Sequence, residues 1–196
     1  MTDFLCFTSC FKNSKVKSSH LDTSRRASSL GGNFVTEHGI ESPISDTYEI
    51  TTILLGTGSS AKVVVGKHKA TQRRYAIKVI DTTKKNITWR YEREKQLLKE
   101  VDHTNIVRLL AVYTSPRAQY FVMELCTGGH LGYALKEAPS GRLDIYTAKC
   151  YVTQIIHAVA HCHKNGICHR DIKLQNILLG IFYIHISVIH LLSFTN

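Results

Sequence analysis

Five short runs rich in β-branched and aromatic residues lie between residues 48 and 125, and this succession limits the possible folds more than any other feature of the chain. The runs read YEITTILL, AKVVVGKHK, RRYAIKVI, IVRLLAVYTS and QYFVMEL in chain order. Gly and polar clusters separate them, as is typical of strands that turn back on one another. We therefore expect a small antiparallel sheet of five strands.

Two helical segments accompany the strand runs. Between the third and fourth runs, TWRYEREKQLLKE places charged residues around an apolar stripe at helical spacing, which predicts a helix over 88–100. After Gly128 and Gly129 the pattern becomes helical again, and a longer helix is predicted from its N-cap Asp144 to His163. Strands followed by helices place the chain in the α+β class.

The turn between the first two strand runs reads LGTGSSAKV and contains Gly56 and Gly58. Glycine lets the main chain fold closely over phosphate oxygens and direct N–H groups at them, where a Cβ would obstruct. A plain hairpin turn is the alternative interpretation of two nearby glycines.

Lys78 lies in an apolar strand run, flanked by Ile77 and Val79. Its side chain either reaches solvent or is buried with a charged partner, because unpaired burial is costly. Glu94 on the following helix is a suitable partner, and the pair would fix the lysine so that it can neutralise the phosphates of a nucleotide. An ordinary surface ion pair is the alternative.

The loop after the long helix reads HRDIKLQN and contains Asp171, Lys173 and Asn176. An aspartate can accept a hydroxyl proton or orient that hydroxyl, and a lysine can hold a transferring phosphoryl group. An asparagine carbonyl can ligate Mg²⁺. The loop therefore carries three complementary roles in phosphoryl transfer.

These motifs occur in one order along the chain, namely LGTGSSAKV, AIK, a helix Glu and HRDIKLQN. In that order they resemble the eukaryotic protein kinases over residues 48–179. Lys173, two residues after Asp171, is similar to the serine/threonine pattern of the family. The segments HTNIVRL and QYFVMELCTGG resemble its calcium/calmodulin-dependent group.

The resemblance implies a protein-kinase-like α+β fold with two lobes. The N-lobe, a five-stranded antiparallel sheet with one helix, would occupy about 48–125, and the first part of a helical C-lobe would occupy 126–179. Residues 1–47 are rich in Ser, Thr, Gly and Asn without sustained periodicity, and we expect them to be a disordered leader. The apolar residues 180–196 would be a tail outside the family pattern.

The resemblance also implies how ATP would bind. Lys78, paired with Glu94, would contact the α- and β-phosphates. The loop over the nucleotide would comprise Leu55, Gly56, Thr57, Gly58, Ser59, Ser60, Ala61 and Val63. The adenine site would comprise the gatekeeper Met123 together with Val63, Ala76, Glu124, Cys126 and Leu178.

In the same family pattern, Asp171 would be the catalytic base, Lys173 a phosphate contact and Asn176 a Mg²⁺ ligand. Two positions depart from the pattern. Ala61 replaces the third glycine of the loop, which should weaken ATP binding only modestly. His130 stands where many kinases of basic substrates have an acidic residue, so the sequence does not predict a preference for Arg-containing substrates.

An acidic metal ligand is missing from the C-terminal part of the sequence. In kinases the Asp of an Asp-Phe-Gly motif follows the loop Asn by about a dozen residues, but no Asp or Glu follows Asp171 here. The activation segment, the Ala-Pro-Glu element and the lower helices of the family are missing too. We therefore expect impaired phosphoryl transfer, with a non-catalytic fragment that binds a nucleotide or a partner as the alternative.

Charge and cysteine content agree with the resemblance without deciding it. Lys and Arg outnumber Asp and Glu by 25 to 15, and such an excess alone does not choose among nucleic acid, anionic lipid and phosphorylated ligands. The family implies ATP, Mg²⁺ and a protein substrate, and no nucleic acid. No secretory signal precedes the six cysteines, so we expect free thiols and a cytoplasmic protein.

Three other interpretations concern the ends of the chain and its histidines. Cys6 and Cys10, beside Phe and Lys residues, could form an acylated N-terminus with weak membrane association, or belong to an ordinary polar tail. The apolar segment before the C-terminus is short for a membrane span of about twenty residues. A strand pair under the catalytic loop, or an unpaired segment produced by a shortened product, is favoured over a span. A zinc site could be formed by a cluster of histidines and cysteines, namely His157, His161, Cys162, His163, Cys168 and His169. The spacing of these residues is not that of paired C-x₂-C units, so zinc binding is disfavoured.

Overall fold

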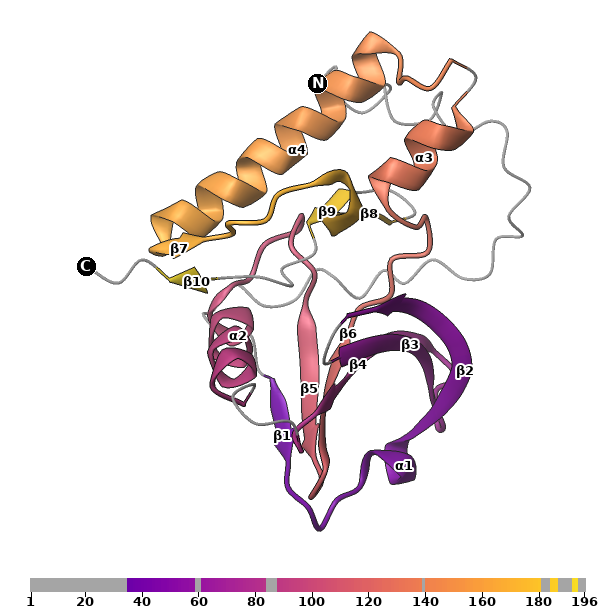
Figure 1. Cartoon of the computed structure of the whole chain (residues 1–196), viewed down its shortest axis with the longest axis vertical. Helices are drawn as coiled ribbons and strands as arrows, with labels where there is room; N and C mark the ends of the chain where they lie inside the picture. The colour runs from indigo at the N-terminus through magenta and orange to yellow at the C-terminus, as the bar shows by residue number, and fades with distance from the viewer. Residues whose placement is uncertain are drawn as a thin grey trace. The chain divides into compact units, whose positions relative to one another are not determined.

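A six-stranded sheet is formed by strands between Thr36 and Met123. The computed structural model describes residues 35–58, 61–83, 88–138, 140–180, 184–186 and 192–193. The strand order is β1-β5-β6-β4-β3-β2 (Figure 1). The strands are β1 (Thr36–His38), β2 (Tyr48–Thr57), β3 (Ala61–His68), β4 (Arg74–Asp81), β5 (Leu109–Thr114) and β6 (Ala118–Met123). All pairs among β2 to β6 are antiparallel, which confirms the five strands predicted from the sequence.

The sixth strand, β1, was not predicted. It pairs in parallel with β5, placing Glu37 beside Val112 and His38 beside Tyr113. The short helix α1 (Ile44–Thr47) follows it, and Ile44 is buried in an apolar cluster. Over residues 35–47 the structure therefore differs from the expected disordered leader, because backbone pairing and burial order a segment that has no periodicity of its own.

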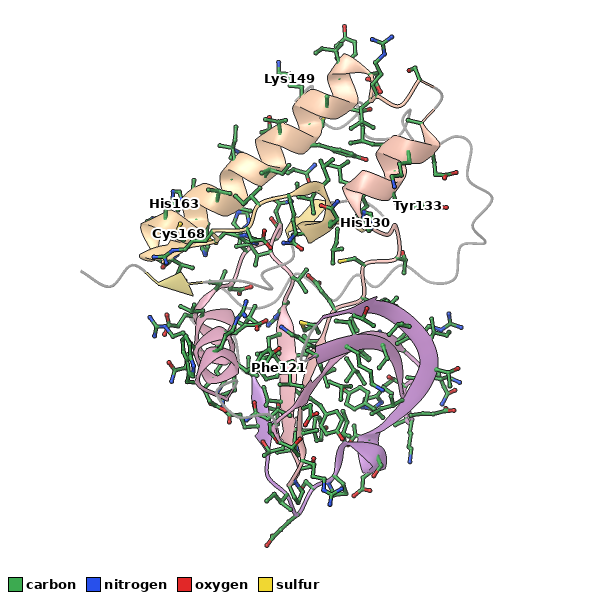
Figure 2. All side chains as sticks on the ribbon, viewed as in Figure 1. Phe121, His130, Tyr133, Lys149, His163 and Cys168 are labelled. Atoms are coloured by element: carbon green, nitrogen blue, oxygen red, sulfur yellow. The ribbon has the colours of Figure 1, made fainter. Side chains whose placement is uncertain are left out.

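The helix α2 (Thr88–Glu100) has the predicted bounds and packs an apolar face against the sheet. The central strands bury large side chains such as Ile77 and Phe121, the latter labelled in Figure 2. One apolar cluster contains Leu97 of α2, Phe121 of β6 and Cys162 of the long helix. Residues far apart in sequence thus share one core, which holds the strands that carry the predicted site.

The long helix α4 (Ile145–Lys164) begins one residue after its predicted N-cap, Asp144. The Asp144 side chain accepts hydrogen bonds from the backbone N–H groups of Tyr146 and Thr147. At the other end Gly166 has φ +69°, a conformation that favours glycine and ends the helix. A short helix, α3 (Leu131–Glu137), precedes α4.

Four short strands surround the loop that follows α4. Strand β8 (Ile177–Leu179) pairs antiparallel with β9 (Ile184–Ile186), and β7 (Ile167–Cys168) pairs antiparallel with β10 (Leu192–Ser193). The described residues of the C-terminal segment thus form strand pairs beside the loop that follows α4, which is one of the two alternatives that the sequence left open. No helix in the described part of the chain is long and apolar enough to span a membrane.

Candidate active site

Lys78 and Glu94 form a buried ion pair between β4 and α2. The Lys78 Nζ lies 2.7 Å from one carboxylate oxygen of Glu94 and 2.8 Å from the other. The exposed fraction is 3% for Lys78 and 5% for Glu94, so the pair is not an ordinary surface salt bridge. The structure therefore contains the pairing that the sequence predicted.

Burial and a neighbouring aromatic ring define the electrostatics of this pair. Burial raises the pKa of the Glu94 carboxyl, and the charge and hydrogen bonds of Lys78 oppose that shift. The ammonium of Lys78 also lies 5.0 Å from the centroid of the Tyr91 ring, within the range of a cation–π contact. A positive charge is thus held in one place with little freedom to move.

The glycine turn joins β2 to β3, and its described residues end at Gly58 and resume at Ala61. The Gly58 N–H donates to the Ala61 carbonyl at 2.8 Å, which closes the turn. A Cβ at Gly56 would meet no protein atom within 4 Å, so the space beside it is open within the described structure. Ser59 and Ser60 lie outside the described residues.

Five of the six predicted adenine residues, all except Glu124, belong to one apolar cluster or pack against it. Ala76 and Met123 are members of the cluster and sit opposite each other in the β4–β6 register. Val63, Cys126 and Leu178 are partly buried against the same cluster. Four strands, β3, β4, β6 and β8, and the segment after β6 thus place these five residues around one apolar region, although they come from distant parts of the sequence.

The segment after β6 connects the sheet to α3 and β8. The Glu124 carboxylate accepts a hydrogen bond from the Arg108 N–H at 3.1 Å. The Gly128 N–H donates to the Leu179 carbonyl at 2.7 Å, and the Leu179 N–H donates to the Gly129 carbonyl at 2.8 Å. A Cβ at Gly128 would lie 2.6 Å from the Leu179 carbonyl oxygen, so only glycine permits this approach.

Cys126 sits in this connecting segment as a free thiol. Burial, followed by the nearby charge of Glu124, raises the pKa of its thiol to about 12. The neutral thiol is therefore the form present at neutral pH, and it serves as an apolar surface of the cluster.

Asp171, Lys173 and Asn176 meet on the loop after β7. The Asn176 amide donates to the backbone carbonyl of Asp171 at 2.8 Å and to its carboxylate at 2.9 Å. The Lys173 Nζ lies 2.8 Å from the same carboxylate oxygen. Asn176 is buried, whereas Asp171 and Lys173 remain partly accessible, so the loop presents a carboxylate and an ammonium on a fixed base.

The backbone just before this group is constrained. The buried His169 accepts a hydrogen bond on Nδ1 from the Asp171 N–H at 3.3 Å. Between them Arg170 has φ +57°, which is uncommon for a residue other than glycine. Such conformations persist only where surrounding contacts impose them, and they are frequent at functional sites.

Metal ligands are few at this loop. Asn176 offers one amide and Asp171 one carboxylate, which already forms an ion pair with Lys173 and accepts a hydrogen bond from Asn176. Among the described residues, no group of three or more His, Cys, Asp or Glu side chains could hold a metal ion. The pair fits Mg²⁺ only where other oxygens, such as those of phosphates, complete the coordination.

Sequence reasoning missed two features of the site's surroundings. His130 caps α3 by accepting the Tyr133 N–H at 3.0 Å, and it forms an isolated bridge with Leu178 (Figure 2). Glu37 on β1 reaches Lys95 and Lys99 on α2. A histidine cap and a three-residue strand have little sequence signal, since each depends on a tertiary neighbour.

An α+β fold with a buried lysine–glutamate pair and an Asp-Lys-Asn loop is typical of a protein kinase domain. The sequence pattern of that family, described as the protein kinase domain, matches residues 49–187. The chain therefore belongs to the protein kinase family. The match also extends beyond the boundary predicted at 179, in agreement with the pairing of β9 with β8.

Curated relatives agree with this assignment. The chain is similar to the hormonally up-regulated neu tumor-associated kinase of Mus musculus, with 43% identity over 136 residues, covering 67% of this chain and 19% of the relative. It is 42% identical over 129 residues to the homolog of Xenopus tropicalis, covering 64% of this chain and 18% of that protein. Calcium-dependent protein kinase 5 of Plasmodium falciparum is 40% identical over 135 residues, covering 69% of this chain and 23% of that kinase.

These relatives support the eukaryotic serine/threonine type and include a calcium-dependent kinase, as the sequence indicated. The chain spans about a fifth of the length of the relatives it matches.

Proposed function

We propose that this chain binds ATP between the glycine turn and β8, in the manner of a serine/threonine protein kinase. The buried Lys78–Glu94 pair carries the proposal. Holding a lysine and a glutamate out of water costs free energy that a surface pair would avoid, so a fixed positive charge in the interior calls for a functional reason. Phosphates are the anions that such a fixed ammonium suits.

The remaining contacts of the nucleotide follow from the apolar cluster. Val63, Ala76 and Leu178 would enclose the adenine ring, with Met123 beside it. The backbone of Glu124 to Cys126 would hydrogen-bond the adenine edge. The turn from Leu55 to Val63 would cover the phosphates, and the open space at Gly56 supports that arrangement.

On the catalytic loop, Asp171 would accept or orient the proton of a substrate hydroxyl, and Lys173 would contact the transferring phosphoryl group. Asn176 would hold Mg²⁺ together with phosphate oxygens. Bound Mg²⁺ would neutralise charge on the phosphates. Asn176 also keeps the Asp171 carboxylate in place through the hydrogen bond of 2.9 Å.

Nucleotide binding can be tested with the full chain and a fluorescent ATP analogue. Lys78→Met should weaken binding at least tenfold, because it removes the charge that meets the phosphates. Lys149→Met, on the exposed surface of α4, is the matched control and should bind as the wild type does. Equal affinity for Lys78→Met and the wild type would contradict the proposal.

A second candidate function is nucleotide or partner binding without phosphoryl transfer. The observation that favours it is the lack of any Asp or Glu after Asp171 in the 196 residues, including the five residues that link β9 to β10. A carboxylate ligand to the metal is an ordinary part of kinase chemistry. We infer that this 196-residue chain by itself transfers phosphate poorly.

The transfer of labelled phosphate from ATP to a mixture of Ser- and Thr-containing peptides distinguishes the two functions. We expect analogue binding with incorporation no greater than that of Asp171→Asn. Incorporation that Asp171→Asn abolishes would support catalysis by this chain and contradict the inference of poor transfer.

A further inference from the structure

Strand β1 attaches the segment before the kinase domain to the edge of the sheet nearest α2 (Figure 1). Its backbone pairs with β5 at three positions, and the His38 ring stacks on Tyr113 with a centroid distance of 4.2 Å and an interplanar angle of 9°. Val35, just before the strand, packs against the main apolar cluster. The position of Glu37, between Val35 and His38, is therefore well determined.

Glu37 joins β1 to the charged face of α2. Its carboxylate pairs with Lys99 and lies 3.8 Å from the Lys95 Nζ. Lys95 in turn lies 2.5 Å from Glu92, one turn earlier on the helix. The Glu92 carboxylate accepts a hydrogen bond of 2.6 Å from Gln119 on β6. A continuous polar network thus runs from β1 across α2 to the centre of the sheet.

The network uses a different face of α2 from the one that meets Lys78. Glu92, Lys95 and Lys99 are three and four residues apart and share one face of the helix. Tyr91, Glu94 and Leu98 have the same spacing and are all buried, at 8%, 5% and 3% exposure. Because both faces belong to one rigid helix, a rotation or shift of α2 that released Glu37 would also move Glu94 relative to Lys78.

We propose that Glu37 is a positioning residue for the nucleotide site: by holding Lys95 and Lys99, it keeps α2 where Glu94 pairs with Lys78. The effect of Glu37 on nucleotide affinity rests on the nucleotide binding proposed above. Strand β1 thereby influences the affinity of the site, since forming or removing the strand changes the fraction of molecules in which the Lys78–Glu94 pair is formed.

The size of the effect follows from the exposure of the partners. Glu37 is about half exposed, with 49% of its side chain accessible, whereas Lys95 is 14% accessible. Ion pairs of this kind shift an equilibrium by up to about fivefold. Reversing the charge of Glu37 places three cations together and should give the largest response.

The test compares Glu37→Lys, the double variant Glu37→Lys/Lys99→Glu and the control Glu41→Lys in the full chain. Glu41 is an exposed carboxylate in the turn after β1, so the control makes the same charge change nearby. Two readouts are measured, the dissociation constant of a fluorescent ATP analogue and the hydrogen exchange of the α2 amides. Hydrogen exchange reports on α2 whether or not the ATP analogue binds. A failure of the proposed nucleotide binding can therefore be told apart from a failure of the role proposed for Glu37.

We expect Glu37→Lys to speed exchange over 88–100 and to weaken analogue binding by about two- to fivefold. The double variant should restore both values, and Glu41→Lys should change neither. The proposal is overturned by Glu37→Lys leaving α2 exchange unchanged, or by a double variant no better than the single one. A fall in melting temperature without a change in either readout would assign Glu37 to stability alone.

Discussion

At the scale of single residues, the Lys78–Glu94 pair shows how a buried charge is made tolerable. Both carboxylate oxygens meet the ammonium within 2.8 Å, and Tyr91 adds its ring face. The pair gains little net free energy from this, because desolvation offsets most of the Coulomb attraction. Losing one partner is a different matter, since the other charge then stays buried alone.

Glu94→Ala should therefore lower the free energy of unfolding by about 3–5 kcal/mol, because it leaves the Lys78 ammonium uncompensated. Replacing both members in Lys78→Met/Glu94→Leu should cost much less, because no buried charge remains. Urea denaturation followed by circular dichroism measures both values. A double variant as unstable as Glu94→Ala would show that packing, not charge, determines the loss.

At the scale of elements, α4 begins at a residue that the sequence identifies well. Asp144 is a good N-cap by type, and its carboxylate accepts two hydrogen bonds of 3.0 Å from the first turn. Hydrogen bonds hold the pKa of Asp144 below its usual value of 3.8. Those from Thr147 have the larger effect, and the one from Tyr146 has a smaller effect. The ionised cap thus stabilises the start of the helix that precedes the catalytic loop.

The lowered pKa gives a pH dependence with a definite sign. A carboxyl with a depressed folded pKa contributes stability above its unfolded value of 3.8, and the contribution is lost as the pH falls through the folded pKa. Asp144→Ala should lower the melting temperature at pH 7, and the difference from the wild type should shrink below pH 3.8.

Circular dichroism melts over a series of pH values check this expectation. Asp144→Asn is the control, because asparagine also caps helices but does not titrate in this range. A difference between the wild type and Asp144→Ala that stays constant down to the acid limit would contradict the role of the ionised carboxylate.

At the scale of the whole described structure, one face of α4 is packed against the core and the other is exposed. Ala158 and Cys162 are buried, and Ile155 packs against two apolar clusters. Val152 and Ile156, four residues apart, are 53% and 57% exposed on the other side. An exposed apolar face of this kind favours association between molecules.

Neighbouring isoleucines provide a matched test of the two faces. Ile156→Gln should raise solubility and reduce the binding of a hydrophobic dye, with a change in unfolding free energy within about 0.5 kcal/mol. Ile155→Gln makes the same chemical change on the packed face and should cost about 1–3 kcal/mol. Static light scattering and denaturant titrations measure the two effects, and equal behaviour of the variants would show that the faces are not distinct.

Local patterns were sufficient for much of this fold. The five strands β2 to β6 and the helices α2 and α4 could be predicted, because alternation and helical spacing extend over whole segments. The Lys78–Glu94 pairing could be predicted because an apolar strand leaves a lysine few alternatives to a charged partner. The assignment of roles to Asp171, Lys173 and Asn176 came from their order within the family motif.

Sequence alone determined the strands β2 to β6, the two main helices and the residues of the kinase motifs, because these depend on residue type and on spacing along one segment. Only the tertiary structure decided that β1 joins β5, that Glu37 reaches α2, and that β9 and β10 find β8 and β7. Short segments such as Thr36–His38 gain their order from hydrogen bonds to distant strands. That contribution is not local, so no pattern within three residues encodes it.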